Sequence, residues 1–459
     1  MNRRSFLGLA AISLASTACG APVARGLFEQ PSMASTIAPN ARPDATSAQA
    51  QASPIATSMA RTQSVPDTTD RLLIRDGAGT SASIVAIDAA RGDVAYRMPA
   101  GLPLTRGAHR ISLLPADGRT TISVRRTSDG ATTQSFTVPG EFGEAALSHD
   151  NGLLLLMQPM AGTTPPKTPM AVVDIRSGDV IEQAQLDGKY LPDTVSPDGS
   201  TIYLVELHPE RKANAYQVAL YDRAQHRVVG KIADKRSAQT IMSGQKVTHV
   251  WSRSGEWLYS LYLDPGSGGD GAFVHALNVK DRFAICIDLP SHGPEEVLRH
   301  YALVRTPSDD VVYATNPALG VINYWHVGEF DARGVPFTMP AIPVPGATGA
   351  SDGDTAYRAG TRSYNNSVMS ADGTTLYIGS DRGIIRTGSD ARAQKSDLWL
   401  PGRAVSSLGM SPSGKVLYAL IAQPRAQLVA LDARDGSQIG DLSGLVAQPA
   451  GIEQVTASS

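Results

Sequence analysis

The chain has 459 residues but only two cysteines, Cys19 and Cys286, and aromatic residues make up only 6% of it. So few cysteines exclude a Cys-x-x-Cys-His haem attachment motif and a zinc site built from cysteines. The sequence also lacks a Gly-rich phosphate loop before a helix, and its single Gly-x-Ser-x-Gly string, at residues 349–353, is not followed by the helical pattern that a nucleophile elbow requires. Apolar residues at the spacing of an amphipathic helix are nearly absent. These absences exclude several enzyme classes and favour a chain built from β-strands.

The charge of the chain is close to balanced. The formal net charge is −2, and removal of residues 1–18, which hold Arg3 and Arg4 but no acid, would bring it to −4. A chain without a basic surplus is not expected to present a basic face. Nucleic acid is therefore not an expected partner.

The N-terminus is typical of an export signal. A charged start is followed by an apolar run at residues 9–18, which is too short to span a bilayer. The segment Arg3-Arg4-Ser5-Phe6-Leu7 resembles a twin-arginine export signal, with Gly8 where that family often has Lys. This resemblance implies export through the membrane in an already folded state.

A second resemblance concerns the end of this signal. Residues 16–20, Ser-Thr-Ala-Cys-Gly, resemble a bacterial lipoprotein cleavage box, although Ser16 departs from the preferred Leu or Val. The resemblance implies that Cys19 becomes the lipid attachment site and holds the protein on a membrane surface. The alternative is ordinary cleavage after Ala18, which would give a secreted or periplasmic protein. Both readings place the mature chain outside the cytoplasm.

Residues 19–66 are rich in Ala, Ser, Thr, Pro and Gln and have few apolar anchors. Such a segment cannot bury enough surface to offset the entropy of ordering, so we expect a disordered stalk. A flexible linker of this length has an average reach of roughly 35–40 Å.

From residue 67 onward one pattern recurs. A turn residue is followed four positions later by a large apolar or aromatic residue inside an apolar run, at intervals of about 35–65 residues. The pairs are Gly118/Ile122, Gly152/Leu156, Gly199/Tyr203, Gly255/Tyr259, Asp309/Tyr313, Gly373/Tyr377 and Gly414/Tyr418. Each turn can reverse the chain, and the run after it is typical of a strand. The period predicts an all-β chain that forms a single β-propeller.

Each repeat reads as four antiparallel strands, so residues 67–455 are the expected propeller. Repeats that begin near residues 109, 143, 190, 246, 296, 364 and 404 give seven blades. Residues 71–100 hold three more strands, and residues 449–455 could supply their missing first strand by pairing the two ends of the propeller. Eight blades are favoured, and seven result if the short unit at 109–139 merges with a neighbour.

The propeller resembles a known repeat family. The segment Tyr313-Ala-Thr-Asn316, followed by Gly320-Val-Ile-Asn-Tyr324, resembles the YVTN-type propeller repeat with one substitution. The similarity extends more loosely over residues 68–455. The family includes surface and periplasmic proteins of unassigned role, and related propellers include lactone hydrolases and amine dehydrogenase heavy chains.

Candidate metal ligands are few. Seven of the nine histidines lie between His208 and His326, and His249 and His300 fall in or near first strands, which line the channel of a propeller. Together they could bind a metal or act as a base, or they could be ordinary structural histidines. The loops at 264–270 and 351–354 could hold calcium but have few carboxylates. We assign no catalytic residue, and no cofactor is required.

Other recurring residues are expected to be structural. An Asp ends several third strands and should accept backbone N–H groups in the next turn. The tyrosines of the second strands should pack as wedges between blades. Cys286 lies in an apolar run and should pack as a small hydrophobic residue.

The sequence thus predicts an exported, lipid-anchored β-propeller of the cell envelope. It would bind an envelope protein or a small ligand through the channel mouth and the inserted loops at 159–169, 208–215, 264–272 and 340–361. The alternative is a metal-dependent, lactonase-like hydrolase or an accessory chain of a periplasmic dehydrogenase, with calcium or another divalent metal.

Overall fold

A computed structural model describes residues 62–77, 82–104, 107–158, 166–212, 214–232, 234, 241–264, 271–289, 295–308, 310–329, 333–336, 366–389, 397–422 and 426–457. The chain separates into the unit Met1–Thr57 and the unit Ser58–Ser459, and every described residue belongs to the second. The export signal, Cys19, most of the expected stalk and the loops at 265–270 and 337–365 lie outside the described residues.

The described residues form eight antiparallel sheets, and each sheet is one blade. Blade 1 consists of β33 (Pro449–Ala457), β1 (Asp70–Asp76), β2 (Ser83–Asp88) and β3 (Asp93–Pro99). Blade 2 consists of β4 (Leu102–Pro103), β5 (His109–Ala116), β6 (Arg119–Arg126) and β7 (Thr132–Pro139). Blade 3 consists of β8 (Glu144–Leu147), β9 (Leu153–Met157), β10 (Lys167–Asp174) and β11 (Val180–Asp187). Blade 4 consists of β12 (Tyr190–Val195), β13 (Thr201–Leu207), β14 (Ala215–Asp222) and β15 (Arg227–Ile232), with the short β16 (Met242–Ser243) added to β14.

The other four blades follow the same order. Blade 5 consists of β17 (Gln245–Trp251), β18 (Trp257–Leu263), β19 (Ala272–Asn278) and β20 (Phe283–Asp288). Blade 6 consists of β21 (Ala302–Arg305), β22 (Val311–Asn316), β23 (Val321–His326) and β24 (Arg333–Pro336), and it is preceded by the single turn of helix α1 (Glu295–Leu298). Blade 7 consists of β25 (Ser367–Met369), β26 (Thr375–Ser380), β27 (Gly383–Gly388) and β28 (Asp397–Trp399). Blade 8 consists of β29 (Val405–Met410), β30 (Val416–Ile421), β31 (Gln427–Asp432) and β32 (Gln438–Asp441).

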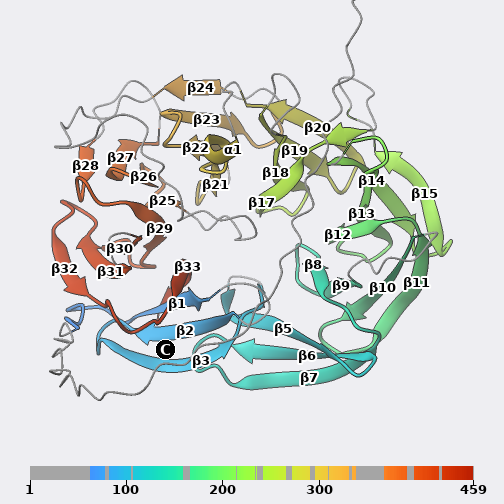
Figure 1. Ribbon diagram of the computed structural model, residues 1–459, viewed down its shortest axis with the longest axis horizontal. Coiled ribbons are helices and arrows are strands. Elements are labelled where there is room, and N and C mark those ends of the chain that lie inside the picture. Colours follow the sequence, from blue (N-terminus) through green and yellow to red (C-terminus); the bar gives the residue numbers. More distant parts are fainter. Residues whose placement is uncertain are drawn as a thin grey trace, which may run out of the picture. The chain divides into compact units, whose positions relative to one another are not determined.

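The eight blades stand in a ring with their first strands toward the centre (Figure 1). This confirms the predicted all-β propeller with eight blades. β33 pairs with β1 in an antiparallel register that places Ile452 opposite Ile74, so the two ends of the ring unit are joined in one sheet. The predicted closure by the tail is therefore confirmed.

Blade 2 departs from the expected pattern. Its first strand, β4, has only two residues, and the turn at Gly118 joins β5 to β6. Ile122 is therefore on a third strand, whereas the sequence pattern placed it on a second one. Asp117 and Gly118 have φ values of 54° and 73°, as a two-residue hairpin requires. The same turn chemistry therefore serves two different connections.

The turns between first and second strands share one hydrogen-bond pattern. Ser196 Oγ donates to Asp198 Oδ1 at 2.6 Å and accepts from the N–H of Thr201 at 3.0 Å. Gly199 completes the reversal with φ 68°. Ser148 and Ser370 start equivalent turns in blades 3 and 7. This repeated turn explains why the sequence pattern recurs.

Tyrosines of the second strands of blades 4 and 7 fasten these blades to the next ones along the ring. Tyr203 donates to the carbonyl of Val279 at 2.6 Å, and Tyr377 donates to the carbonyl of Ala433 at 2.9 Å. Both partners lie one blade further along the ring. These contacts confirm the expected wedge role of the second-strand tyrosines.

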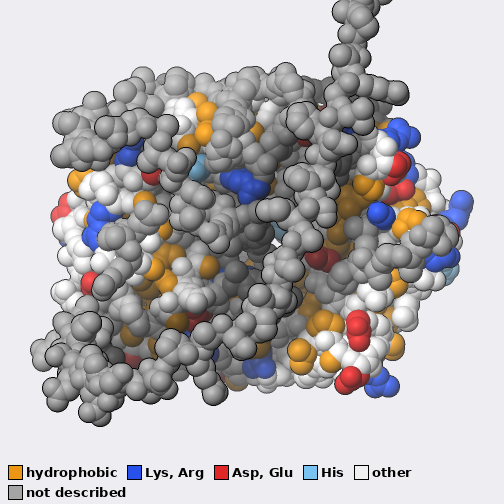
Figure 2. All heavy atoms as spheres, in the orientation of Figure 1, with side chains coloured by type: hydrophobic (Ala, Val, Ile, Leu, Met, Phe, Trp, Pro, Cys, Tyr) orange, Lys and Arg blue, Asp and Glu red, His pale blue; other side chains and the backbone are white. Residues whose placement is uncertain are grey.

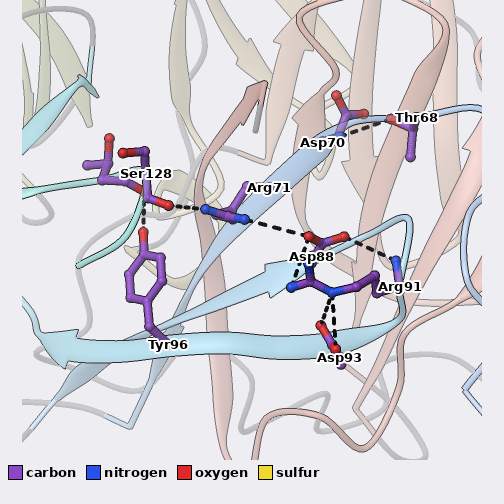
Figure 3. A network of polar contacts seen from close by, with 9 residues as sticks. Thr68, Asp70, Arg71, Asp88, Arg91, Asp93, Tyr96 and Ser128 are labelled. Atoms are coloured by element: carbon purple, nitrogen blue, oxygen red, sulfur yellow. Dashed lines mark hydrogen bonds and ion pairs between the residues drawn. The ribbon is translucent and has the colours of Figure 1, made fainter. Parts of the chain in front are cut away.

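The carboxylates at the ends of third strands hold tight turns, as expected. Asp174 Oδ1 accepts from the N–H groups of Arg176 and Ser177 at 2.8 and 3.1 Å. In blade 1, Asp88 accepts from the N–H of Arg91 at 3.1 Å and pairs with the side chains of Arg71 and Arg91 (Figure 3). These aspartates are structural.

The described strand ends that flank the long insertions of the sequence lie on one face of the ring. In antiparallel blades, the ends of second strands and the starts of third strands lie on the same face as the ends of fourth strands and the starts of the next first strands. The flanking strands are β9 and β10, β13 and β14, β18 and β19, and β24 and β25. We call this the insertion face. In Figure 2, charged side chains of both signs are scattered around the rim of the ring.

The described residues include no helix long and apolar enough to cross a membrane.

Candidate functional site

A cavity of about 1320 Å³ occupies the centre of the ring and is lined by the first strands of all eight blades. In six blades its lining comes from the first strand, joined in blades 3, 6 and 7 by residues of the turn that follows it. At blades 4 and 5 the lining extends outward to the second strands β13 and β18 and to the third strand β14. The channel therefore has a side pocket between these two blades.

We call this the blade 4–5 pocket and define it by Asp193 of β12, Tyr216 of β14, Gln245 and Lys246 of β17, and Tyr262 of β18. Tyr216 and Gln245 lie at the starts of their strands, and Tyr262 lies near the end of β18. All three positions are at the insertion face, so the pocket lies toward that end of the channel.

An ion pair crosses the seam between the blades. Lys246 Nζ lies 2.6 Å from Asp193 Oδ1, and the side chains are 25% and 4% exposed. Burial by itself would raise the pKa of Asp193, but the charge and hydrogen bond of Lys246, with smaller effects of His275 and His249, lower it instead. Asp193 is therefore held as a carboxylate beside Lys246.

Behind this pair, three aromatic rings form a stack. Tyr216 and Tyr262 stack with centroids 4.6 Å apart and an interplanar angle of 9°, and Tyr262 stacks on Phe273 at 5.4 Å. Tyr216 and Tyr262 are only 1% and 2% exposed, and their hydroxyls interact with each other but have no other hydrogen-bond partner among the described residues. Burial raises the pKa of both phenols well above the usual value of 10.0. Two neutral hydroxyls are thus buried behind the wall of the channel.

A buried histidine supports the two tyrosines. The ring centroid of His275 lies 6.4 Å from that of Tyr216 and 6.1 Å from that of Tyr262. Its Nε2 has no hydrogen-bond partner among the described residues. Burial lowers the pKa of His275 from 6.5 to about 4, so the imidazole is neutral at neutral pH. Cys286, on β20 opposite His275, packs its Sγ 3.6 Å from Met242 Sδ, in agreement with the expected packing role.

Local backbone features explain why the pocket forms here. β16 returns to pair with the start of β14, and Gly244 then leads into β17 with φ 151°. A Cβ at Gly244 would lie 3.2 Å from both Leu263 O and Tyr262 Cβ, so glycine permits this close approach. Lys212 Nζ contacts Asp264 at 3.0 Å and Ser243 Oγ donates to Asp264 at 3.2 Å. These contacts connect the insertions of blades 4 and 5.

The two candidate metal-ligating histidines occupy different surroundings. His249 lies on β17 and lines the channel, and its charge acts on Asp193. His300 precedes β21 and is not among the residues that line the cavity. Burial lowers its pKa, with a smaller opposing effect of Asp381. Within the described ranges no three His, Cys, Asp or Glu side chains are grouped as metal ligands.

A charge cluster lies on the channel wall at blades 1 and 2. Glu453 of β33 accepts from Arg75 at 2.7 Å and from Arg110 at 3.0 Å. Burial would raise the pKa of Glu453, but the two guanidinium groups lower it. Arg110 also donates to the carbonyl of Gly101 at 2.7 Å. This cluster joins β33, β1 and β5 at the point of ring closure.

Sequence reasoning missed the residues of the blade 4–5 pocket. Tyr262 lies three positions after the wedge tyrosine Tyr259, and Tyr216 lies on a third strand, so neither fits the repeat. One signal in the sequence could have indicated them, namely a charged residue in a first strand, because first strands line the channel. Asp193 and Lys246 both satisfy that condition.

Comparison with known proteins supports the fold alone. The sequence matches no protein-family model and no curated protein. Among solved structures, apo AztD from Citrobacter koseri aligns with a TM-score of 0.52 and 11% identity over 84% of this chain and 97% of that chain. The dihydro-heme d1 dehydrogenase NirN in complex with DHE gives a TM-score of 0.46 and 11% identity over 84% and 75%. Hydrazine synthase of Kuenenia stuttgartiensis gives 0.41 and 13% over 67% and 89%. The eight blades define the class, a β-propeller, and the likeness to AztD at 11% identity concerns the fold and no activity.

Proposed function

We propose that this protein is an exported β-propeller that binds a small molecule in its central channel. The observation that carries the proposal is the channel cavity of about 1320 Å³, whose wall at the blade 4–5 pocket holds the ion pair of Asp193 and Lys246. A large concave cavity, mostly apolar and with a few polar groups on its wall, is the usual form of a small-molecule site.

The position of these groups favours a small ligand over a protein partner. The polar groups lie inside the channel, and the side chains of Asp193 and Lys246 are only 4% and 25% exposed. A folded protein partner would meet the rim and the insertion face first. No contact of the described residues favours the hydrolase alternative, and metal analysis of the purified protein would test it.

The export part of the proposal rests on the sequence. Arg3 and Arg4 fit a twin-arginine signal and Cys19 fits a lipid attachment site. The propeller that follows would then be held at a membrane surface by the stalk. The ring unit begins near Gln63, which exchanges backbone hydrogen bonds with Asp441 of the outer strand β32 at 2.7 and 2.9 Å.

Binding in the channel can be tested by blocking it. Ala146 on β8 lines the channel, whereas Val229 on the outer strand β15 is 40% exposed. Wild type, Ala146→Trp and Val229→Trp would be mixed with a small-molecule extract of the cell envelope, and bound molecules identified by native mass spectrometry. We expect a bound species in wild type and Val229→Trp that is lost in Ala146→Trp. Equal occupancy in all three variants, or none in wild type, would overturn channel binding.

The anchor is tested separately in cells. Incorporation of a radioactive fatty acid and recovery in the membrane fraction should both be lost in Cys19→Ala. A Cys286→Ala variant is the matched control because Cys286 is the other cysteine of the chain. Unchanged labelling of Cys19→Ala would refute lipid attachment at this residue.

A further inference from the structure

We propose that two copies of this chain associate through the outer edge of blade 2, where β7 of one copy pairs in antiparallel direction with β7 of the other. β7 lies on the outside of the ring (Figure 1) and contributes no residue to the lining of the channel. The inference is therefore independent of ligand binding in the channel. Three properties of β7 support it: its lack of charge, its free backbone groups and its fixed position on the neighbouring blade.

β7 differs from the other outer strands in its charge. An outer strand has unpaired backbone groups along one edge, and charged side chains commonly protect such an edge from other strands. β7 has eight residues, and none of them is charged. Each of the other seven described outer strands contains at least one charged residue: Asp93 and Arg97 in β3, Glu182 and Asp187 in β11, Arg227 and Lys231 in β15, Asp288 in β20, Arg333 in β24, Asp397 in β28, and Asp441 in β32. β7 is therefore the outer strand that charge protects least.

The middle of β7 has backbone groups that β6 does not use. β7 is the terminal strand of its sheet in the described part of the chain. Just past the strand, the N–H of Gly140 donates to the carbonyl of Gly118 at 2.8 Å, on the side of β6. The backbone groups of an antiparallel strand point alternately to its two sides. The N–H and C=O groups of Thr137 and Ser135 therefore point away from β6, toward a strand that could be added.

A second copy of β7 fits this edge. Two identical strands related by a two-fold axis run antiparallel, so each gives the other the same hydrogen bonds that it receives. The register of the β6–β7 pair shifts before Gln134, and Pro139 has no N–H to donate, so the free edge covers residues 134–138. Within it Ser135 would lie opposite or diagonal to Ser135 of the second copy. No like charges would meet there, whereas like charges on facing strands oppose pairing.

Blade 3 holds one face of β7 in place. The side chain of Gln134 donates to the carbonyl of Arg176 at 3.0 Å. Gly178 packs so closely on the ring of Phe136 that an added Cβ would lie 3.0 Å from it. Ser135 is on the opposite face and is exposed. Because the strand is already ordered, pairing costs less conformational entropy than it would for a flexible segment.

Analytical ultracentrifugation measures this association. The full chain carries Cys19→Ala, so that a lipid cannot hold copies together. We expect a reversible monomer–dimer equilibrium with a dissociation constant on the order of 100 µM, because the paired segment is short and the interface small. A chain that stays monomeric at about ten times that concentration would overturn the inference.

A charge placed at the centre of the edge should prevent pairing. Ser135→Lys and Ser135→Glu should each weaken self-association by about tenfold or more, because the same charge then meets itself across the two-fold axis. Val229→Lys is the matched control, since it adds one charge to the outer strand β15 at a residue that is 40% exposed. Its self-association should equal that of the unsubstituted chain.

A mixture of the two charged variants tests the contact directly. Ser135→Lys and Ser135→Glu, with one of them fluorescently labelled, should associate at least as tightly as the unsubstituted chain, because opposite charges then meet. Such recovery also shows that both variants are folded.

Two results of the variants would overturn the inference. Equal self-association of Ser135→Lys and the unsubstituted chain would show that the copies associate through another surface. A mixture that fails to associate would show that the single variants lost the dimer through damage to the strand. The channel-blocking test of Ala146→Trp is unaffected by either result.

Discussion

Two seams of the ring bury the same kinds of residue and use them differently. At the closing seam between blades 8 and 1, Asp70 accepts from Tyr418 Oη at 2.8 Å and from Ser411 Oγ at 3.1 Å. At the seam between blades 4 and 5, Asp193 pairs with Lys246, while the hydroxyls of Tyr216 and Tyr262 interact with each other and have no other partner among the described residues.

The difference shows how a structural contact can be told from a recognition site within one fold. At the closing seam the buried carboxylate and the hydroxyls satisfy each other, so nothing is left for a ligand. At the blade 4–5 pocket the carboxylate is satisfied by a lysine and polar capacity remains on the channel wall. Residue type alone does not distinguish the two seams, whereas the completeness of hydrogen bonding does.

The largest expected effect follows from breaking the ion pair of the pocket. Lys246→Met would leave Asp193 as a buried carboxylate without its cation, at a cost of about 3–4 kcal/mol in the free energy of unfolding. This cost is at the lower end of the range for breaking a buried ion pair, because the side chain of Lys246 is 25% exposed. Urea denaturation followed by circular dichroism measures the change.

The matched control for this change removes both charges. Asp193→Asn/Lys246→Met should recover most of the stability lost in Lys246→Met, since no unpaired charge remains. If the double variant is as unstable as the single one, the loss comes from packing and not from the orphaned carboxylate.

The next effect concerns pH and the histidine behind the stack. The pKa of His275 is about 4 in the folded chain, below its ordinary value of 6.5, because of burial. Below 6.5 the unfolded chain binds a proton that the folded chain does not, so stability falls as the pH drops from 6.5 to 4. The loss due to this group approaches about 3 kcal/mol at the acid end.

This effect is measured as the difference between wild type and His275→Gln in urea denaturation across that pH range. The variant should show a shallower fall. His300 also has its pKa lowered by burial, so His300→Gln is a useful control that retains the His275 contribution. Parallel stability curves for wild type and His275→Gln would contradict the assignment.

The smallest effect compares one tyrosine from each seam. Tyr418→Phe removes a hydrogen bond to the buried Asp70 carboxylate and should cost about 2 kcal/mol. Tyr216→Phe removes a hydroxyl that interacts with the neutral hydroxyl of Tyr262 and has no hydrogen bond to a charged group among the described residues, and should change the free energy of unfolding by less than about 1 kcal/mol. Equal losses in the two variants would show that Tyr216 is bonded like Tyr418 and would remove the contrast between the seams.

Much of the fold was predictable because it depends on local chemistry. The turn at Ser196 and its equivalents in other blades reveal the repeat length of the blades. Asp174 and Asp88 indicate the tight turns after third strands. Residues 449–455 indicate the strand that closes the ring. The exception in blade 2 has a local cause too, since Gly118 uses the same turn chemistry for a different connection.

The candidate site was less predictable. His249 was correctly placed beside the channel, but His300 does not line it. The pocket residues gave little signal because each is an ordinary strand residue in the sequence. Their function depends on which neighbour they meet across a seam and on which hydrogen bonds are left unfilled.

The sequence by itself determined a propeller of four-stranded antiparallel blades, with eight favoured over seven, because turn residues and apolar strands act over a few neighbouring positions and repeat. Only the tertiary structure decided that Asp193, Tyr216, Lys246 and Tyr262 line one pocket. These four residues come from four strands of two blades, and the packing of whole blades brings them together.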